Sequence, residues 1–162
     1  MDLRRTRGHT VIELMVVVVV LAILAAIVIP SASVGDERKL DTVQLAIQDA
    51  LDHAQSLAYH QGVAYGVRFS LPGQWFAVVN ENGVPMSDPL SHGDYLVRLS
   101  GPNIPTDVHL DYANFGVRPL AAFSEKGILI ESGELQLRAG QTTRFLACET
   151  ATATLMEVPS SP

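Results

Sequence analysis

The sequence predicts an α+β protein: a long N-terminal helix, hydrophobic and then amphipathic, packed on a sandwich-like head of antiparallel β-sheet. Three observations predict this fold. An uncharged apolar run extends from Leu14 to Ile29, apolar side chains recur at helical spacing over about residues 36–60, and a period of two dominates residues 63–158. The 162 residues thus divide into a short basic segment, an apolar helix and one head of ordinary size, residues 31–162.

The apolar helix, residues 9–30, is predicted to be long enough to cross a bilayer. From His9 to Ile29 it would measure about 31 Å at 1.5 Å per residue, close to the thickness of the hydrocarbon layer. Arg4, Arg5 and Arg7 precede it and only Asp2 opposes them, which favours a cytoplasmic N-terminus. We therefore expect a single-pass membrane protein whose head lies outside the cytoplasm.

Glu13 stands at the start of the apolar run, where a plain membrane anchor needs no carboxylate. An ionised side chain at the edge of a lipid-spanning helix costs on the order of a few kcal/mol if it is unpaired, so we expect Glu13 to have a partner. A secretory signal peptide cut near Ser31–Ser33 and an ordinary anchor are the alternatives. Sixteen uncharged residues are long for a signal-peptide core, and neither alternative explains Glu13.

The order Gly8, Thr10, Glu13 and Leu14, followed by the apolar run, resembles the type IV prepilin signal. The resemblance implies that a prepilin peptidase cuts between Gly8 and His9, so that residues 1–8 are a leader and Glu13 becomes the fifth mature residue. It also implies N-methylation at His9. Glu13 would then serve subunit assembly by pairing with the terminal amine of a neighbour as the helices, residues 9–30, bundle into a filament. The family usually has Phe where this chain has His9.

After the apolar run, an amphipathic helix is predicted over about residues 36–60. Pro30 and the segment 31–35 could break or bend the chain before it, so one long helix kinked near Pro30 and ending at Gly62 is the economical interpretation. The predicted buried face consists of Leu40, Val43, Ile47, Ala50, Leu51, Ala54, Leu57 and Ala58.

From Val63 onward the sequence predicts an antiparallel meander. Alternation over 107–112 places Val108, Leu110 and Tyr112 on one face, and Ser132-Gly133 reads as a two-residue hairpin turn. The expected strands are 63–70, 74–80, a short strand within 95–99, 107–112, 128–131, 134–138, one around Phe145, and 151–158.

This arrangement resembles the minor pseudopilins of the H family of type II secretion and their type IV pilus relative. The similar segments are Val67–Phe69 with Pro72-Gly73, then Phe123–Gly127 and Gly133–Leu137. The resemblance implies a structural subunit without enzymatic activity, held in the inner membrane with a periplasmic head, in a pseudopilus that exports folded proteins. Its partners would be the prepilin peptidase, the inner-membrane assembly platform and other pseudopilins at a filament tip. The alternatives are a type IV pilus minor pilin, with a role in DNA uptake, and a membrane-anchored periplasmic enzyme.

The charge of the head argues against a nucleic-acid partner. Residues 31–162 hold 8 Lys or Arg against 15 Asp or Glu, and such a surface repels phosphates. A local basic patch around Arg138 and Arg144 is left open.

No catalytic residue, cofactor or metal site is predicted. Asp49, His53 and His60 share helical spacing but are interpreted as a solvated surface. Asp107, His109 and Asp111 could in principle gather a cation, but are interpreted as the solvent-exposed face of a strand. Cys148 is the only cysteine, which excludes an intrachain disulfide, and is expected to be a buried structural thiol.

Overall fold

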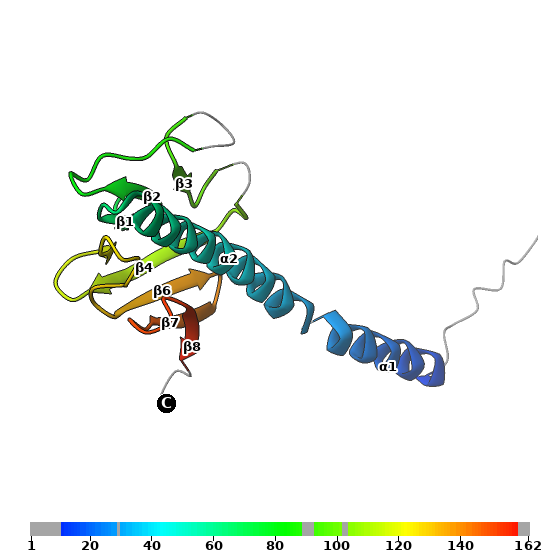
Figure 1. The fold of residues 1–162 in the computed structure, drawn as a ribbon. Helices are drawn as coiled ribbons and strands as arrows, with labels where there is room; N and C mark the ends of the chain where they lie inside the picture. Colours follow the sequence, from blue (N-terminus) through cyan, green and yellow to red (C-terminus); the bar gives the residue numbers. More distant parts are fainter. Residues whose placement is uncertain (1–10, 29, 89–92, 102–103, 159–162) are drawn as a thin grey trace, which may run out of the picture. The chain divides into compact units, whose positions relative to one another are not determined.

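The computed structural model describes residues 11–28, 30–88, 93–101 and 104–158, with the side chains of 24–28 and 30–34 left out of the description. The chain forms two compact units, residues 1–35 and 36–162. The first contains helix α1 (Val11–Val28) and the start of helix α2 (Pro30–Gln61), and the second contains the rest of α2 and all the strands (Figure 1). Ile29 lies outside the described residues, so the predicted kink between the two helices stays a prediction.

Helix α2 runs without a break through residues 31–35, a segment whose sequence could break or bend a helix. Pro30 is its first residue, a position where the missing N–H of proline leaves no hydrogen bond unmade. Gly35 lies inside the helix, with no atom within 4 Å of the place where a Cβ would stand. A glycine there costs about 1 kcal/mol relative to alanine, which the rest of a 32-residue helix tolerates. Of the two effects considered for residues 31–35, a break does not occur.

The amphipathic pattern of α2 is confirmed. Seven of the eight predicted apolar positions are fully buried and the eighth, Leu57, is partly buried against the same core. The helix ends as predicted, since Gly62 has a φ of 63° and donates its N–H to the Ala58 carbonyl. The fully buried positions are Leu40, Val43, Ile47, Ala50, Leu51, Ala54 and Ala58.

The strands form two four-stranded antiparallel sheets. In the view of Figure 1, β1, β2 and β3 lie on one side of α2 and β4, β6, β7 and β8 on the other. The first sheet has the order β3-β2-β1-β5 and the second the order β4-β6-β7-β8. Their bounds are β1 Tyr65–Ser70, β2 Trp75–Asn80, β3 Leu96–Arg98, β4 Val108–Phe115, β5 Leu120–Phe123, β6 Gly133–Ala139, β7 Thr142–Cys148 and β8 Leu155–Val158.

The predicted meander, in which each strand pairs with the next along the chain, is found in part of each sheet. It is interrupted where the chain passes from one sheet to the other. β1, β2 and β3 follow one another, as do β6, β7 and β8, whereas β4 crosses to the second sheet and β5 returns to pair with β1. One hydrophobic core contains residues of α2 and of both sheets. Among its largest fully buried side chains are Phe76, Phe115 and Phe123, which come from three different strands.

The strand expected at residues 128–131 is wrong, and so is the hairpin turn at Ser132-Gly133. Leu129 makes an isolated bridge to Phe123, and Ile130 donates its N–H to the Ala122 carbonyl, so this segment pairs back onto β5. Gly133 is instead the first residue of β6, and a Cβ there would lie 2.1 Å from Cδ1 of Phe115. The glycine is required by a close approach to an aromatic ring, which local sequence does not distinguish from a turn.

A β-bulge changes the face of one predicted side chain in β4. The register passes from Leu110 opposite Leu137 to Tyr112 opposite Gln136, which leaves Asp111 as the extra residue. Tyr112, predicted to share a face with Val108 and Leu110, is therefore 43% exposed, and Ala113 is buried in its place. The alternation holds only up to the bulge.

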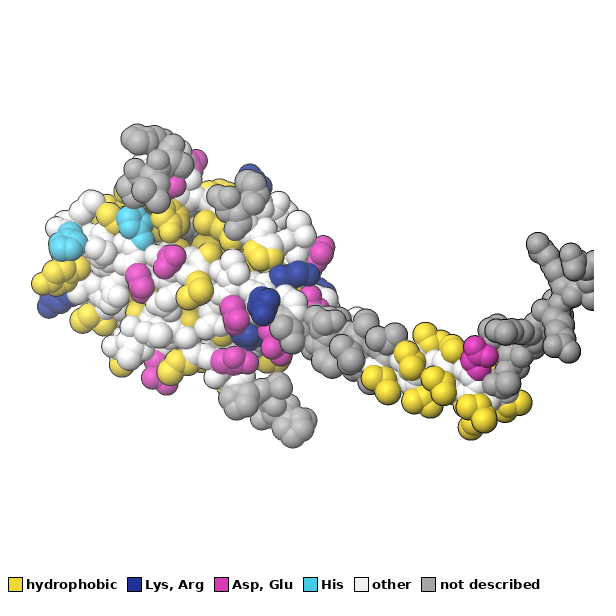
Figure 2. Space-filling model, turned by 90° about the vertical axis from the view of Figure 1, so that its right-hand side faces the viewer, with side chains coloured by type: hydrophobic (Ala, Val, Ile, Leu, Met, Phe, Trp, Pro, Cys, Tyr) yellow, Lys and Arg dark blue, Asp and Glu magenta, His cyan; other side chains and the backbone are white. Residues whose placement is uncertain are grey.

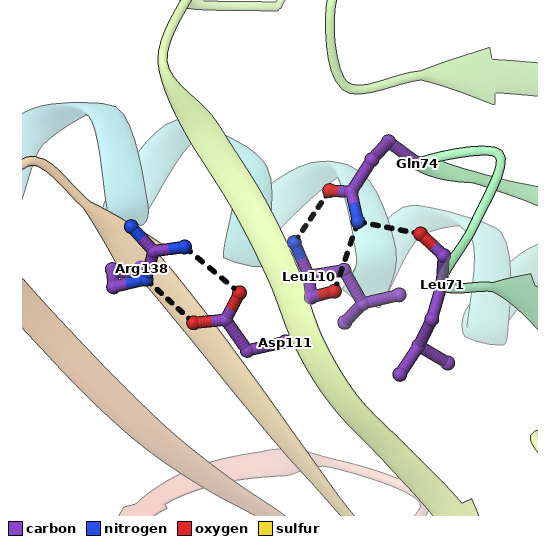
Figure 3. A network of polar contacts seen from close by, with 5 residues as sticks. All are labelled: Leu71, Gln74, Leu110, Asp111 and Arg138. Carbon is purple, nitrogen blue, oxygen red and sulfur yellow. Dashed lines mark hydrogen bonds and ion pairs between the residues drawn. The ribbon is translucent and has the colours of Figure 1, made fainter.

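The two sheets are also joined by a side chain. Gln74, the last residue of the turn between β1 and β2, donates from Nε2 to the carbonyls of Leu71 (2.6 Å) and Leu110 (3.1 Å). The N–H of Leu110 donates to Oε1 of Gln74 at 2.8 Å, and Figure 3 shows the amide beside the β4 backbone. Gln74 thereby pairs with the exposed edge of β4 as a short piece of strand would.

Candidate functional site

The N-terminal candidate is an apolar helix with one carboxylate. Glu13 lies in the first turn of α1 and is the only charged residue of that helix. A carboxylate is favoured there by the partial positive charge of the helix N-terminus. Gly8 and His9, the predicted cleavage and methylation residues, lie outside the described residues.

The side chains of α1 are exposed on every face, as far along as they are described. Figure 2 shows hydrophobic side chains over the visible surface of the helix. Their exposed fractions run from 48% at Val20 to 79% at Val11. A helix that is hydrophobic all round is normally buried, by lipid or by other helices. Among the helices in the part of the chain that the structure describes, however, none has the length together with the hydropathy that crossing a membrane requires.

The predicted histidine candidates on α2 are not brought together. The ring of His53 stacks on that of Tyr95, with centroids 5.2 Å apart and planes 14° apart. Burial, followed by the charges of Asp49 and Asp88, raises the pKa of Tyr95. His60 instead lines a separate hollow of about 290 Å³, together with Tyr59 and Lys126. Within the described chain, no three His, Cys, Asp or Glu side chains gather as metal ligands would.

The strand candidates around Asp111 form an ion pair rather than a cation site. Arg138 donates from Nε and Nη2 to the two carboxylate oxygens of Asp111 at 2.6 and 3.1 Å (Figure 3). This hydrogen bond holds the pKa of Asp111 below its usual value. Asp107, His109 and Asp111 are all exposed, which confirms the predicted solvent-facing side of this segment. Asp107 itself precedes β4 and has a φ of 72°.

Arg138 and Arg144 do not form one basic patch. They occupy neighbouring rows of the second sheet, since Arg138 pairs with Thr143 and Arg144 with Leu137, so their side chains leave opposite faces. Arg144 points to α2, where Nη1 donates to Asp41 at 2.6 Å and to Gln44 at 3.0 Å, and its Nε lies 3.7 Å from Glu157. Its side chain is only 11% exposed.

Cys148 is the buried thiol that the sequence predicts. It ends β7, its side chain is 1% exposed, and it has no disulfide partner. Burial raises its pKa to about 11, so little of it is the reactive thiolate at neutral pH. The expectation of a structural role is consistent with this environment.

Comparison with known proteins locates a similarity at the N-terminus. Residues 3–29 match the family model described as the prokaryotic N-terminal methylation motif. The chain has a type IV pilin-like N-terminus. Comparison with curated proteins and with solved structures gives no match to the chain.

The type IV pilin-like N-terminus includes the whole of α1, so the motif bears on the role of that helix. The matched residues include Gly8, His9 and Glu13, and they end at Ile29, just before α2. A motif of this kind implies an N-terminal membrane anchor, processing by a prepilin peptidase and assembly with other pilins. It indicates a structural protein of the pilin type rather than an enzyme. The α+β architecture, with α2 packed on antiparallel sheets, is consistent with a pilin-like fold.

Proposed function

We propose that the protein is a structural minor pseudopilin of a type II secretion system. Prepilin peptidase removes residues 1–8 and methylates the new terminus at His9. The mature chain stays in the inner membrane through residues 9–30, with a periplasmic head, until it enters the tip of a pseudopilus that moves folded proteins outward. The observation that carries the pilin-like part of this proposal is the methylation motif over residues 3–29. Glu13 lies within that motif, in the first turn of the otherwise apolar helix α1.

Two properties of α1 support an assembly role. First, its exposed apolar surface extends around the helix, so burial requires lipid or neighbouring helices. Second, Glu13 is the one ionisable group on that surface, and an ionised carboxylate in an apolar bundle is stable only when a cation neutralises it. The terminal amine of another subunit, created when Gly8 is cut from His9, supplies such a cation. Helix packing and charge pairing would then act together during recruitment.

The head supports secretion over DNA uptake. It carries an excess of acidic residues, and both arginines considered as a DNA patch are engaged by carboxylates: Arg138 by Asp111, and Arg144 by Asp41. A minor pilin of a type IV pilus has the same N-terminal requirements. Tight, salt-sensitive DNA binding by the protein would favour that alternative.

The proposal is tested by substituting Glu13 in cells that contain the processing and assembly machinery. Glu13→Ala keeps the helix apolar, so membrane insertion should be unchanged while the amount of protein in sheared filaments falls at least about tenfold, as expected for the loss of about 1.4 kcal/mol or more of recruitment energy. Glu13→Asp is the matched control, because it keeps the charge and should retain most of the incorporation. Normal filament entry by Glu13→Ala would contradict the charge-pairing role.

A further inference from the structure

The outer face of the second sheet carries a row of four side chains, of which three are apolar and exposed to solvent and one is the polar Gln136. Tyr112 of β4 lies opposite Gln136 of β6, Gln136 opposite Phe145 of β7, and Phe145 opposite Val158 of β8. Tyr112, Phe145 and Val158 are 43%, 39% and 44% exposed, whereas the alternate positions on β6 and β7 supply the core. Phe145 and Val158 are adjacent exposed apolar side chains, and grouped apolar side chains on a solvated face mark a candidate contact surface.

A hollow lies beside this row. The next row of the sheet pairs Asn114 with Glu134, Glu134 with Ala147, and Ala147 with Met156. Since Ala147 has only a methyl group between longer neighbours, the surface is open above it. The resulting hollow of about 410 Å³ is lined by Tyr112, Asn114, Glu134, Ala147 and Glu149, among others. This volume lies within the range of about 300–1,000 Å³ that is typical of ligand pockets.

The charge of the hollow has one sign. Glu134 and Glu149 are the ionisable carboxylates among its described lining residues, and no Lys, Arg or His side chain lines it. The nearest basic residue along β6 on the same face, Arg138, is held bidentately by Asp111. The site therefore combines an aromatic wall at Tyr112, a small floor at Ala147 and an acidic rim.

We propose that this hollow binds a short segment of a partner protein in which an aliphatic or aromatic side chain stands next to a Lys or Arg. The apolar side chain lies over Ala147 against the ring of Tyr112, and the cation pairs with Glu134 and Glu149. Charge complementarity favours a basic partner and disfavours an acidic one. The exposed apolar side chains of Tyr112, Phe145 and Val158 supply contact area. The site is on the head, so it does not depend on processing of the N-terminus.

The test uses the full chain in detergent and fluorescence anisotropy of labelled nine-residue peptides. The probe alternates Lys with Phe and Val; a second peptide replaces every Lys by Glu, and a third replaces every Phe and Val by Ser. We expect saturable binding of the first peptide alone, weakened by salt because the charges are exposed. Equal binding of the all-serine peptide, or no binding of the first, would overturn the proposal.

Two substitutions in β7 test whether the peptide binds in this hollow. Ala147→Leu fills the floor of the hollow and should weaken binding at least about tenfold, equivalent to about 1.4 kcal/mol. Thr143→Leu is the matched control, since Thr143 is exposed four residues earlier on the same face of β7 and does not line the hollow. An equal effect of both substitutions, or none from Ala147→Leu, would overturn the site.

A second pair of variants keeps the proposal testable if Ala147→Leu fails to fold. Glu134→Gln combined with Glu149→Gln removes the acidic rim at exposed positions and should weaken binding several-fold at low salt. Glu125→Gln, in the exposed turn after β5, removes a charge elsewhere and should leave binding unchanged. Unaltered binding by the double variant would contradict the charge pairing.

Discussion

The side chain of Gln74 pairs with the backbone of Leu110 in both directions, accepting its N–H at 2.8 Å and donating to its carbonyl at 3.1 Å. β4 is an edge strand of its sheet, and an unpaired edge invites pairing with other chains. A single amide thus satisfies both backbone groups of one edge residue. It also ties the turn of the first sheet to the second sheet.

Shortening Gln74 should therefore destabilise the head. Gln74→Asn keeps the amide and tolerates the left-handed φ of 49°, but is one methylene shorter, so the contacts with Leu110 should be lost. We expect the free energy of unfolding to fall by about 1–2 kcal/mol, measured by denaturant titration. Gln141→Asn, at an exposed turn glutamine, is the control and should cause little change. Equal stability of the two variants would show that the bridge is dispensable.

Arg144 should matter more for stability than Arg138. Arg144→Met removes the hydrogen bonds to Asp41 and Gln44 that join β7 to α2, and should lower the free energy of unfolding by about 1–2 kcal/mol. Arg138→Met breaks an ion pair at a more exposed site and should have a smaller effect, because solvent screens exposed pairs. The measurement is thermal unfolding of the two variants under the same conditions. A larger loss of stability in Arg138→Met than in Arg144→Met would contradict the prediction.

The Asp111–Arg138 pair should make a small part of the stability depend on pH. Because the pKa of Asp111 is lowered in the folded state, its contribution is present above the ordinary value of 3.8 and is lost as the pH falls through the folded value. Wild type and Asp111→Asn should thus differ in unfolding free energy at neutral pH and converge in acid. A difference that persists undiminished at pH 2 would mean that the carboxylate charge is not responsible.

Cys148 should resist alkylation while the protein is folded. With its pKa raised from 9.0 to about 11, the thiolate fraction at pH 8 falls about a hundredfold, and burial restricts access further. Mass spectrometry after iodoacetamide treatment should show slow labelling of the native protein and rapid labelling in denaturant. Comparable rates in the two states would indicate an accessible thiol.

Local pattern was sufficient to predict those elements whose periodicity is uninterrupted. The helical face from Leu40 to Ala58, the end of α2 at Gly62 and the neighbouring strands β1 and β2 all follow from residues within one element or one turn. The methylation motif is likewise contiguous, so Gly8 and Glu13 could be singled out without knowledge of the fold.

Features that depend on distant contacts were not predicted. The bulge at Asp111 is stabilised by pairing with β6 and by Arg138, 27 residues away, and nothing in residues 107–112 marks it. The four residues of β5 (Leu120–Phe123) are too few to show a period, and their strand character comes from pairing with β1. The hollow over Ala147 depends on the register of three strands, which local sequence does not specify.

We propose that this chain is processed as a prepilin at Gly8, which makes Glu13 the fifth residue of the mature protein. The most direct test is mass spectrometry of the N-terminal peptide, from cells with active prepilin peptidase. We predict a chain that begins at His9 and carries one methyl group on its amine. A chain that keeps Met1–Gly8, or one that begins after Ser33, would contradict the account.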